Sequence, residues 1–351
     1  MRLGDNCNIQ MCKRIMAAQT NTEGGVPFYK IGTIGGKADA YISKDLFDEY
    51  KMKYSFPHKG EVMITCAGTV GKCIIYNGED SYYQDSNIVW IDNPNEIISN
   101  DFLYHLLSKI NWSHLNSTTI VRIYNDDLRN LKLYYPHHDE QKKITHLFQL
   151  INERIATQNK IIDKLQSLIK GISNIIFASI QGREYRMGEI ATITNGDSNV
   201  QDAVTEPKEG MYPFFDRSED IKYLPTFLFD KEALIYPGEG AEFMPRYIKG
   251  KFALHQRCYA IFDFKDIVNV QFLYFYLKTQ NSYFIRNAVG STVPSLRLDT
   301  FQKLKVIIPP KVMQRKVSLC LSSIEQKCNA EKVILQSLLK QKQYLLRQMF
   351  I

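Results

Sequence analysis

Two long stretches of the 351-residue chain carry hydrophobic residues at steps of three and four, which is the spacing of one face of a helix. In residues 137–181 these positions are Ile144, Leu147, Ile151, Ile155, Ile162, Leu165, Ile169, Ile172 and Ile176. In residues 311–351 they are Val317, Cys320, Ile324, Cys328, Leu335, Leu338, Leu345 and Met349. A pattern sustained for so long is typical of a coiled-coil seam. Because a lone helix of this kind needs a partner, we expect the two helices to form an antiparallel pair.

The same junction precedes both helical stretches. The apolar runs "LKLYY" at 131–135 and "LKVII" at 304–308 each predict a short strand. Each run is followed by proline, which suits a first helical turn because its φ is fixed and its missing N–H would be unpaired there. Five residues beyond that proline each copy has a glutamine, at Gln141 and Gln314. Two copies in the same register are much more specific than one.

The similarity extends from the junction back to the start of each half. "RLGDNCNI" resembles "RMGEIATI", "GGVPFY" resembles "GMYPFF", and "DFLYHLL" resembles "QFLYFYL", whereas the segments between them differ. The chain is therefore a duplicated unit of one globular domain and one long helix. We predict an α+β fold of two globular domains separated and followed by two long helices, with the bounds 1–135, 136–181, 182–308 and 309–351.

Each helical seam also contains a polar residue at the equivalent position, Gln158 in the first and Glu331 in the second. A single buried polar residue often sets the register of a coiled coil. Lys342 falls on the second seam as well, which weakens the seam there. These two polar positions therefore predict a defined alignment of the two helices.

The net charge of +7 is concentrated in the two helical stretches. Residues 137–181 carry +2 and residues 311–351 carry +6, which leaves −1 for the globular parts. A globular domain that is not broadly basic lacks the general footprint of a nucleic-acid binder. Any contact with nucleic acid must therefore use local patches.

The seven cysteines show neither a C-x-x-C pair nor a zinc-ligand spacing. Reduced, mostly buried thiols in a cytoplasmic protein are the expected state. The N-terminal sequence lacks the apolar core of a signal peptide, and no apolar run approaches the ~20 residues of a membrane span. We expect a cytoplasmic protein that binds no metal.

With these features the sequence resembles the specificity (S) subunits of type I restriction–modification systems. In that family a target-recognition domain ends in a strand, and Pro-Pro-x-x-x-Gln-x-x-Ile-like residues then open a long helix, all of it twice. The first junction departs modestly from the pattern with Pro136-His137, and the second has Met313-Gln314 where the family usually has Glu-Gln. The resemblance covers nearly the whole chain.

The resemblance implies a function and a set of partners. Each globular domain would bind one half of a bipartite, asymmetric site in double-stranded DNA. The helices would set the spacing and dock two methyltransferase (M) subunits, with restriction (R) subunits joining the assembly. S-adenosylmethionine, ATP and Mg²⁺ would be bound by those partners and not by this chain. The complex would lie in the cytoplasm of a prokaryote, associated with the nucleoid.

Catalytic motifs are absent from the sequence, in agreement with a recognition subunit. "DNPNEI" lacks the second proline and the aromatic residue of the loop with which amino-methyltransferases hold the target amine. No G-x-x-x-x-G-K-[ST] loop is present for ATP, and "EYK" lacks the upstream "PD" of a nuclease. The sequence therefore predicts a binding protein without a catalytic centre of its own.

Candidate DNA contacts in the first domain come from three segments. "AGTVGK" resembles the family's Gly-[Ser/Thr]-x-Gly-Lys turn, whose glycine N–H groups can approach phosphate; an ordinary glycine hairpin is the alternative. "YYQDSN" offers amides that pair with adenine, although tyrosines in such a strand are more often core residues. With "TTIVR", these segments give the candidates Thr69, Lys72, Tyr83, Gln84, Asn87, Thr119 and Arg122.

In the second domain the candidates are mostly cationic. Arginine bidentate to guanine is the commonest specific contact in the major groove, and lysines neutralise phosphate. "HQR" occupies the place that "YQDSN" occupies in the first half. The candidates are Arg217, Arg246, Lys249, His255, Gln256, Arg257 and Arg297.

Two other functions are compatible with the residues alone. A coiled-coil structural adaptor without a DNA role would show no salt-dependent binding to duplex. A nuclease or transferase with an unrecognised motif would show turnover by the purified chain alone.

Overall fold

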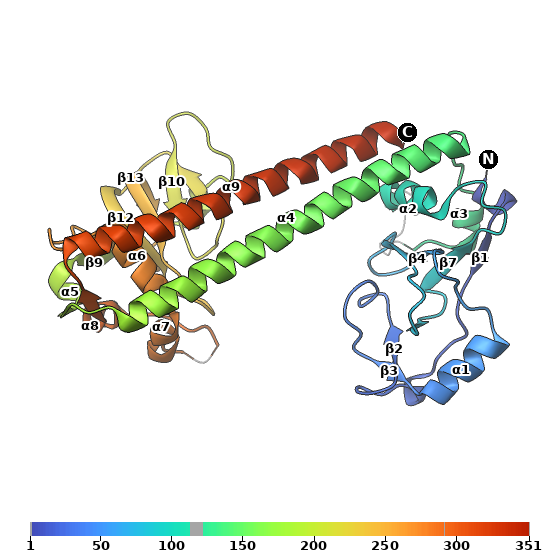
Figure 1. Ribbon diagram of the computed structural model, residues 1–351, viewed down its shortest axis with the longest axis horizontal. Helices are drawn as coiled ribbons and strands as arrows, with labels where there is room; N and C mark the ends of the chain where they lie inside the picture. Colours follow the sequence, from blue (N-terminus) through green and yellow to red (C-terminus); the bar gives the residue numbers. More distant parts are fainter. Residues whose placement is uncertain (1, 113–121, 291, 351) are drawn as a thin grey trace. The chain divides into compact units, whose positions relative to one another are not determined.

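The computed structural model describes residues 2–112, 122–290 and 292–350 (Figure 1). The chain divides into two compact units. The first unit is Met1–Thr157 together with Leu335–Ile351, and the second is Gln158–Ile334. Each long helix contributes one part to each unit.

The first unit is built on a four-stranded antiparallel sheet in the order β1-β7-β4-β5, with a smaller sheet in the order β3-β2-β6. The strands are β1 (Asn8–Gln10), β2 (Val26–Tyr29), β3 (Tyr41–Ile42), β4 (Val62–Thr65), β5 (Cys73–Ile75), β6 (Tyr82–Tyr83) and β7 (Ile88–Asp92). The helices are α1 (Lys44–Lys53), α2 (Asn100–Lys109) and α3 (Asn125–Arg129), with short 3-10 turns η1 (Leu3–Asp5) and η2 (Ala17–Gln19). Strand β4 is buried on both faces because α2 packs on one side and the smaller sheet on the other.

The second unit contains a six-stranded sheet in the order β11-β10-β13-β12-β14-β9 and a two-stranded sheet of β15 and β8. The strands are β8 (Arg183–Arg186), β9 (Thr192–Asn195), β10 (Tyr212–Phe215), β11 (Lys222–Leu224), β12 (Phe229–Pro237), β13 (Arg246–Leu254), β14 (Cys258–Phe262) and β15 (Lys305–Ile308). The helices are α5 (Met187–Ile190), α6 (Val270–Lys278), α7 (Asn281–Asn287) and α8 (Leu298–Lys303), with the turn η4 (Val200–Asp202). The chain is thus of the predicted α+β class.

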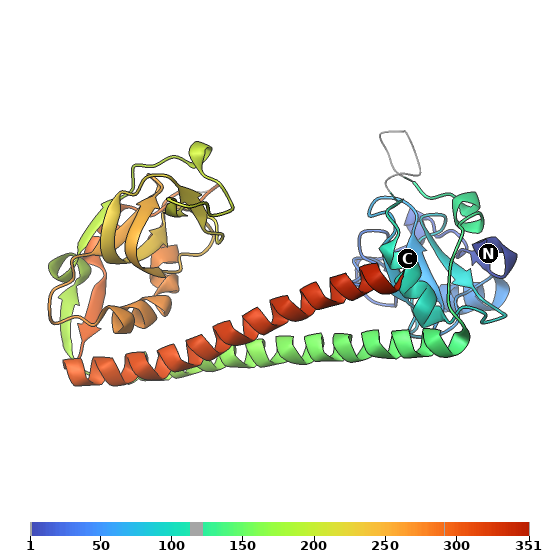
Figure 2. The ribbon, with the colours of Figure 1, turned by 90° about the horizontal axis from the view of Figure 1, so that it is seen from above.

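The two predicted long helices are present as α4 (His138–Ser179) and α9 (Lys311–Met349), which run side by side (Figures 1 and 2). In the first unit the ring of Phe148 in α4 lies 5.6 Å from that of Phe350 just beyond α9. In the second unit Gln158 contacts Glu331. Since the partner number falls as the number along α4 rises, the helices are antiparallel, as predicted.

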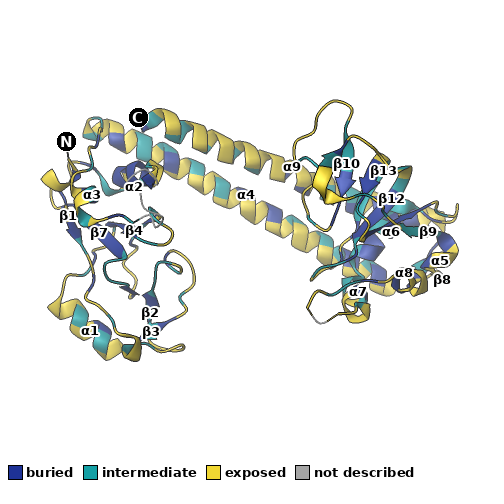
Figure 3. Ribbon diagram, turned by 180° about the vertical axis from the view of Figure 1, so that it is seen from behind, coloured by how far each residue is buried: buried dark blue, intermediate teal, exposed yellow. Residues whose placement is uncertain are grey.

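The seam follows the predicted positions with two corrections. Ile162 is buried, and nine further residues predicted for the seam are half-buried: Ile144, Ile151, Ile155, Leu165, Ile169, Ile324, Leu335, Leu338 and Leu345. Cys320 is exposed, however, whereas its neighbour Leu321 is fully buried, and Phe148 is fully buried beside the half-buried Leu147. At these two places the helices also pack against α2 or α6, which rotates the buried face by one residue. The outer faces of α4 and α9 are exposed (Figure 3).

The polar seam residues Gln158 and Glu331 meet each other in the second unit. Both side chains are buried, and the Gln158 amide donates to the Glu331 backbone carbonyl at 3.1 Å and to its carboxylate. Lys327 Nζ lies 2.5 Å from the same carboxylate. A buried carboxylate requires such partners, so this pair favours one alignment of α4 on α9.

The repeated junction has the same bonds in both units. The Gln141 side chain, fully buried, accepts from the Ser99 backbone N–H at 2.8 Å and donates to the carbonyls of Ile97 and Pro136 at 3.1 and 3.0 Å. The glutamine therefore joins the first turn of α4 to the segment that opens α2.

The second glutamine repeats this arrangement. The Gln314 side chain, also fully buried, accepts from the Asn269 N–H at 2.7 Å and donates to the carbonyls of Ile267 and Pro309, both at 2.8 Å. It joins α9 to α6 in the same way. The first predicted strand, 131–135, is wrong in one respect: among the residues that the structure describes, its β-pairing is an isolated bridge between Lys132 and Arg2, and η1 begins directly after Arg2.

Candidate nucleic-acid interface

Three loops that carry predicted DNA contacts meet in the first unit. They are the turn after β4 (66–72), the connection from β6 to β7 (84–87) and the segment before α3 (122–124), which together we call the first loop cluster. The Cys66 N–H donates to the Asn87 carbonyl at 2.7 Å, and the Ile123 N–H donates to the Cys66 carbonyl at 2.9 Å. Backbone bonds therefore fix the three loops side by side.

The second unit has an equivalent arrangement, which we call the second loop cluster (238–240, 255–257 and 295–297). The Leu296 N–H donates to the Gly238 carbonyl at 2.7 Å, and Glu239 forms a β-bridge with Ser295. A Cβ on Gly238 would overlap the carbonyl oxygen of Arg257, so the loops approach as closely as glycine allows. The same three connections of the repeated fold thus converge in both units.

The turn after β4 is a tight hairpin. Gly68 and Gly71 have φ of 67° and 81°, values that favour glycine. The Lys72 and Gly71 N–H groups donate to the side chain and carbonyl of Thr65 at 3.0 and 2.8 Å. Thr69 and Lys72 are exposed on this turn, and the Lys72 amine donates to the Ile34 carbonyl. The turn therefore presents a hydroxyl and a cation to solvent, as a phosphate contact requires.

The connection from β6 to β7 presents amides. Gln84 and Asn87 are half-buried, and Gln84 Oε1 accepts from the Ile31 N–H at 3.3 Å. They line a hollow of about 360 Å³ together with Arg14 and Lys30, two cations that were not predicted because they lie far from this segment in the chain. Lys30 directly follows strand β2, whose last residue, Tyr29, accepts from the Gln84 N–H at 2.9 Å. Arg14 is placed beside this segment by its ion pair with Asp85 at 2.7 Å.

The other candidates of the first unit differ in placement. Arg122 lies over the Tyr124 ring at 5.8 Å and donates to the Ser86 carbonyl at 3.5 Å, so it belongs to the cluster. Tyr83 is 4% exposed and its hydroxyl pairs with Ser81 at 2.9 Å, which gives its ring a role in the core and not at a surface. Thr119 lies outside the described residues.

In the second unit His255, Gln256 and Arg257 form one loop of the cluster. Gln256 and Arg257 are exposed, whereas His255 is half-buried, and its Nδ1 accepts from the Arg257 N–H at 3.2 Å. Burial lowers the pKa of His255; the positive charges of Arg257 and Arg217 lower it further, against the opposing effect of nearby Asp216 and Glu239. His255 is therefore neutral at pH 7, and its neighbours supply the positive charge.

Arg217 follows β10, and Arg246 holds the loop that carries it. Arg246 donates to the carbonyls of Ser218 and Asp216 at 2.9 and 2.5 Å and lies over the Phe215 ring at 4.9 Å. A guanidinium used in this way is not available to phosphate, so Arg246 is a positioning residue. Asp216 is buried and paired with Lys222 at 2.6 Å.

The last two candidates lie on different elements. Lys249 is exposed within β13, opposite Glu232, and is separate from the second loop cluster. Arg297 is exposed at the residue before α8, within the cluster. Glu239 was not among the predicted residues, and its carboxylate contacts Arg257 Nη1 at 2.9 and 3.1 Å.

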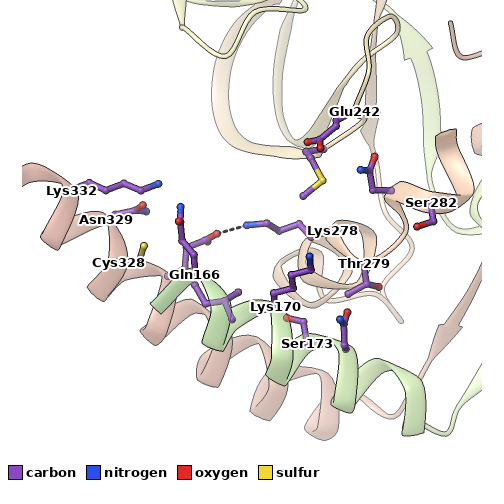
Figure 4. Close-up of a pocket in the computed structure, with 15 residues that line it drawn as sticks. Gln166, Lys170, Ser173, Glu242, Lys278, Thr279, Ser282, Cys328, Asn329 and Lys332 are labelled. Carbon is purple, nitrogen blue, oxygen red and sulfur yellow. Dashed lines mark hydrogen bonds and ion pairs between the residues drawn. The ribbon is translucent and has the colours of Figure 1, made fainter. Parts of the chain in front are cut away.

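A separate hollow of about 550 Å³ lies between α4, α9 and the end of α6 in the second unit (Figure 4). Lys170, Lys278 and Lys332 line it, and Lys278 is paired with Glu325 at 2.7 Å. Its lining shares no described residue with the second loop cluster. The pair joins α6 to α9 and stabilises the packing of the helix on the unit.

Other kinds of site are not found in the part of the chain that the structure describes. No group of three or more potential metal ligands occurs there. The cysteines are unpaired, and all but Cys320 are buried. Within the same residues no helix combines the length and the apolar character that crossing a bilayer requires.

Comparison with known proteins gives one consistent result. The family model described as type I restriction modification DNA specificity domain matches residues 1–167 and again 182–340. A putative type I restriction enzyme specificity subunit of Haemophilus influenzae is 42% identical over 186 residues, which are 53% of this chain and 45% of that protein. The EcoDI specificity subunit of Escherichia coli is 28% identical over 132 residues, 37% of this chain and 28% of that protein. The matched segments thus span less than half of these relatives.

Two solved structures share the fold over the whole chain. The S subunit of a type I restriction–modification system from M. genitalium has a TM-score of 0.65 at 16% identity, with 100% of this chain and 95% of that one covered. A chain from a structure that describes complex assembly and conformational transition of the type I R-M system has a TM-score of 0.58 at 15% identity, with 100% of this chain and 96% of that one covered. At such identities the likeness concerns the fold alone.

Proposed function

Because this chain belongs to the family of type I restriction–modification DNA specificity domains, we propose that it is the subunit through which such a complex recognises DNA. Each unit binds one half of a bipartite site in double-stranded DNA. The observation that carries this proposal is the repeated loop cluster: the same three connections converge in both units, but they present different side chains.

The chemistry of the two clusters supports an asymmetric site. The first cluster presents Gln84 and Asn87, and such amides pair bidentately with adenine. The second presents Gln256 and Arg257, and arginine pairs bidentately with guanine. Different side chains on equivalent loops therefore bind different bases, so the two half-sites differ in sequence.

The exposed faces of the long helices support docking of two identical M subunits. Ile161 on α4 and Ile334 on α9 are 37% and 41% exposed, and they are equivalent positions of the repeat. A large apolar side chain that recurs at the same place in both copies fits two similar contacts with two copies of one partner. R subunits join the assembly through those partners.

The chain contributes recognition and no chemistry in this proposal. The methyl donor S-adenosylmethionine, ATP and Mg²⁺ bind to the M and R subunits, which carry adenine methylation, translocation and cutting. The complex acts in the cytoplasm of a prokaryotic cell, where its DNA is. Neither a structural adaptor nor an independent nuclease accounts for the two matched loop clusters.

Mapping of methylated adenines in the host genome tests the function. We expect a split motif with two different half-sites and a fixed gap, present in the wild type and absent after deletion of the gene. Loss of the motif should be reversed when the gene is returned. A methylation pattern that does not change on deletion would refute the proposal, as would DNA cleavage by the purified chain alone.

A further inference from the structure

The second loop cluster contains an ion pair between Arg257 and Glu239 that lies at the surface and not in the core. The side chain of Arg257 is 64% exposed and that of Glu239 is 18% exposed. Arg257 Nη1 lies 2.9 and 3.1 Å from the two carboxylate oxygens. A pair whose cation is mostly in water stabilises a fold little. The defined geometry of this pair therefore affects how the guanidinium of Arg257 is presented to solvent more than it affects stability.

The backbone on both sides of Glu239 is fixed. The Gly240 N–H donates to the Pro294 carbonyl at 3.0 Å and the Leu296 N–H donates to the Gly238 carbonyl at 2.7 Å, and these two bonds form the β-bridge of Glu239 with Ser295. The preceding residue is Gly238, which packs on the backbone of Arg257 itself. A carboxylate on a fixed loop can fix the guanidinium that it binds. Arg257 thereby loses rotamer freedom before any DNA is bound.

The contact with Glu239 leaves one side of the guanidinium available. Both carboxylate oxygens contact the same nitrogen, Nη1, while Nη2 and Nε have no bond to any residue that the structure describes. Nη2 and Nε are parallel donors of the planar guanidinium fork. This is the geometry that matches the adjacent O6 and N7 acceptors of guanine in the major groove.

We propose that Glu239 is a specificity-determining residue that holds Arg257 by Nη1, so that Nη2 and Nε bind the O6 and N7 of one guanine. The inference rests on the proposed function and assigns one base to the half-site bound by the second unit. Glu239 contacts no base; it acts through Arg257. Its carboxylate also repels phosphate, which favours a base edge over the DNA backbone as the partner of this arginine.

The test measures base preference in the reconstituted complex with its M subunits. Methylation is followed on duplexes in which each position of both half-sites is varied in turn. We expect Arg257→Lys to lower the preference for one guanine about 5- to 150-fold, the range for one bidentate pair. Glu239→Gln should lower the preference at that same position, and the double variant should lose little more than Arg257→Lys alone, because the two residues act as one unit.

Glu184→Gln is the matched control. It removes a carboxylate from another exposed pair of the same unit, with Lys305 at 2.8 Å on the sheet of β8 and β15, and should leave every preference unchanged. Preference at the other half-site and the melting temperature report folding of each variant.

Three results would overturn the inference. The first is an unchanged profile in Glu239→Gln. The second is weaker binding of Arg257→Lys to all duplexes alike with its base preferences unchanged, which would make Arg257 a phosphate contact. The third is a second half-site without guanine. Absence of any split motif in the wild type would instead refute the proposed function, and the inference with it.

Discussion

At the residue scale, the hairpin of the first loop cluster depends on the contact between Gly71 and Trp112. A Cβ on Gly71 would overlap the indole ring, and the φ of 81° adds strain of its own. We expect Gly71→Ala to destabilise the first unit by about 1–2 kcal/mol from φ and about 1–3 kcal/mol from overlap.

Gly24→Ala is the control, because Gly24 has a φ of 78° and open space around it. Gly24→Ala should therefore lose only the stability that the positive φ costs a residue with a side chain. Denaturant unfolding of both variants measures the difference, and equal losses of stability would show that the indole yields without cost.

Lys72 tests the phosphate contact of the same hairpin. If its amine neutralises one phosphate, Lys72→Ala should weaken binding to all duplexes alike and make the slope of log K against log[salt] shallower by about 0.9. Lys59→Ala, which removes another exposed lysine of the first unit, should leave the slope unchanged. An unchanged slope in Lys72→Ala would reduce the turn to a structural hairpin whose lysine serves only the Ile34 carbonyl.

His105 makes the first unit sensitive to acid. Burial, and then the charge of Lys342, lower the pKa of His105 from 6.5 to about 4. Its ring packs at 4.8 Å from Phe148 and 5.5 Å from Phe350. Between pH 6.5 and 4 the unfolded chain binds a proton at this histidine that the folded chain does not, so acid favours the unfolded chain. The stability that depends on a neutral His105 is therefore complete above pH 6.5. It is lost as the pH falls from 6.5 towards 4.

The free energy of unfolding should fall by on the order of 2–3 kcal/mol between pH 7 and 4.5 because of His105. His105→Phe should remove it, since the repeat has Phe275 at the equivalent place. Unfolding free energies at the two pH values, measured for both proteins, decide this; the same slope in the variant would assign the acid sensitivity to other groups.

At the element scale, the pair of Gln158 and Glu331 determines how α4 lies on α9. Removing one partner takes the hydrogen bond between them from the other, which stays buried, and this is more costly than removing both. We expect Gln158→Leu and Glu331→Leu each to lower stability by about 1–3 kcal/mol, and the double variant to recover part of that loss.

Thermal unfolding of the four proteins forms a double-mutant cycle. Gln149→Leu, an exposed change on the same helix, should have little effect on stability. Additive losses in the cycle would mean that the two residues act independently.

The helices and their junctions could be predicted because their signals are local and occur twice. Prolines, glutamines and a seam at steps of three and four are visible in the sequence itself. The one-residue shifts to Phe148 and Leu321 could not be seen, because α2 and α6 contribute to the buried face from outside the helix pair.

The loop clusters were predicted as residue types but not as sites. Gln84, Asn87, Gln256 and Arg257 were predicted from their chemistry and stay predictions, whereas Glu239 was not predicted because a carboxylate gives no DNA signal of its own. Its role depends on a distance to Arg257 that only the sheet register fixes. Tyr83 has a side chain that could contact DNA, but the structure buries it in the core.

At the scale of the whole molecule, the lengths of α4 and α9 should set the gap between the half-sites. We would insert seven residues after Thr157 in α4 and after Ile334 in α9, at the boundary between the units. Seven residues add about 10 Å and keep the seam in phase. At about 3.4 Å per base pair the gap should lengthen by roughly three base pairs, with both half-sites unchanged.

Methylation mapping of the double insertion measures the gap. Insertion into α4 alone, which leaves the seam mismatched, should abolish methylation and not lengthen the gap. An active double insertion with the original gap would show that the helices do not determine spacing.

The two buried glutamines of the junctions have a consequence for how such proteins change over time. Every bond made by Gln141 and Gln314 goes to a main-chain N–H or carbonyl, which all sequences offer except for the N–H that proline lacks. The joint between helix and unit therefore makes few demands on the side chains of the unit. A gene exchange that replaces everything between the two junctions would leave the joint intact, and a lineage could acquire a new DNA target in one recombination event.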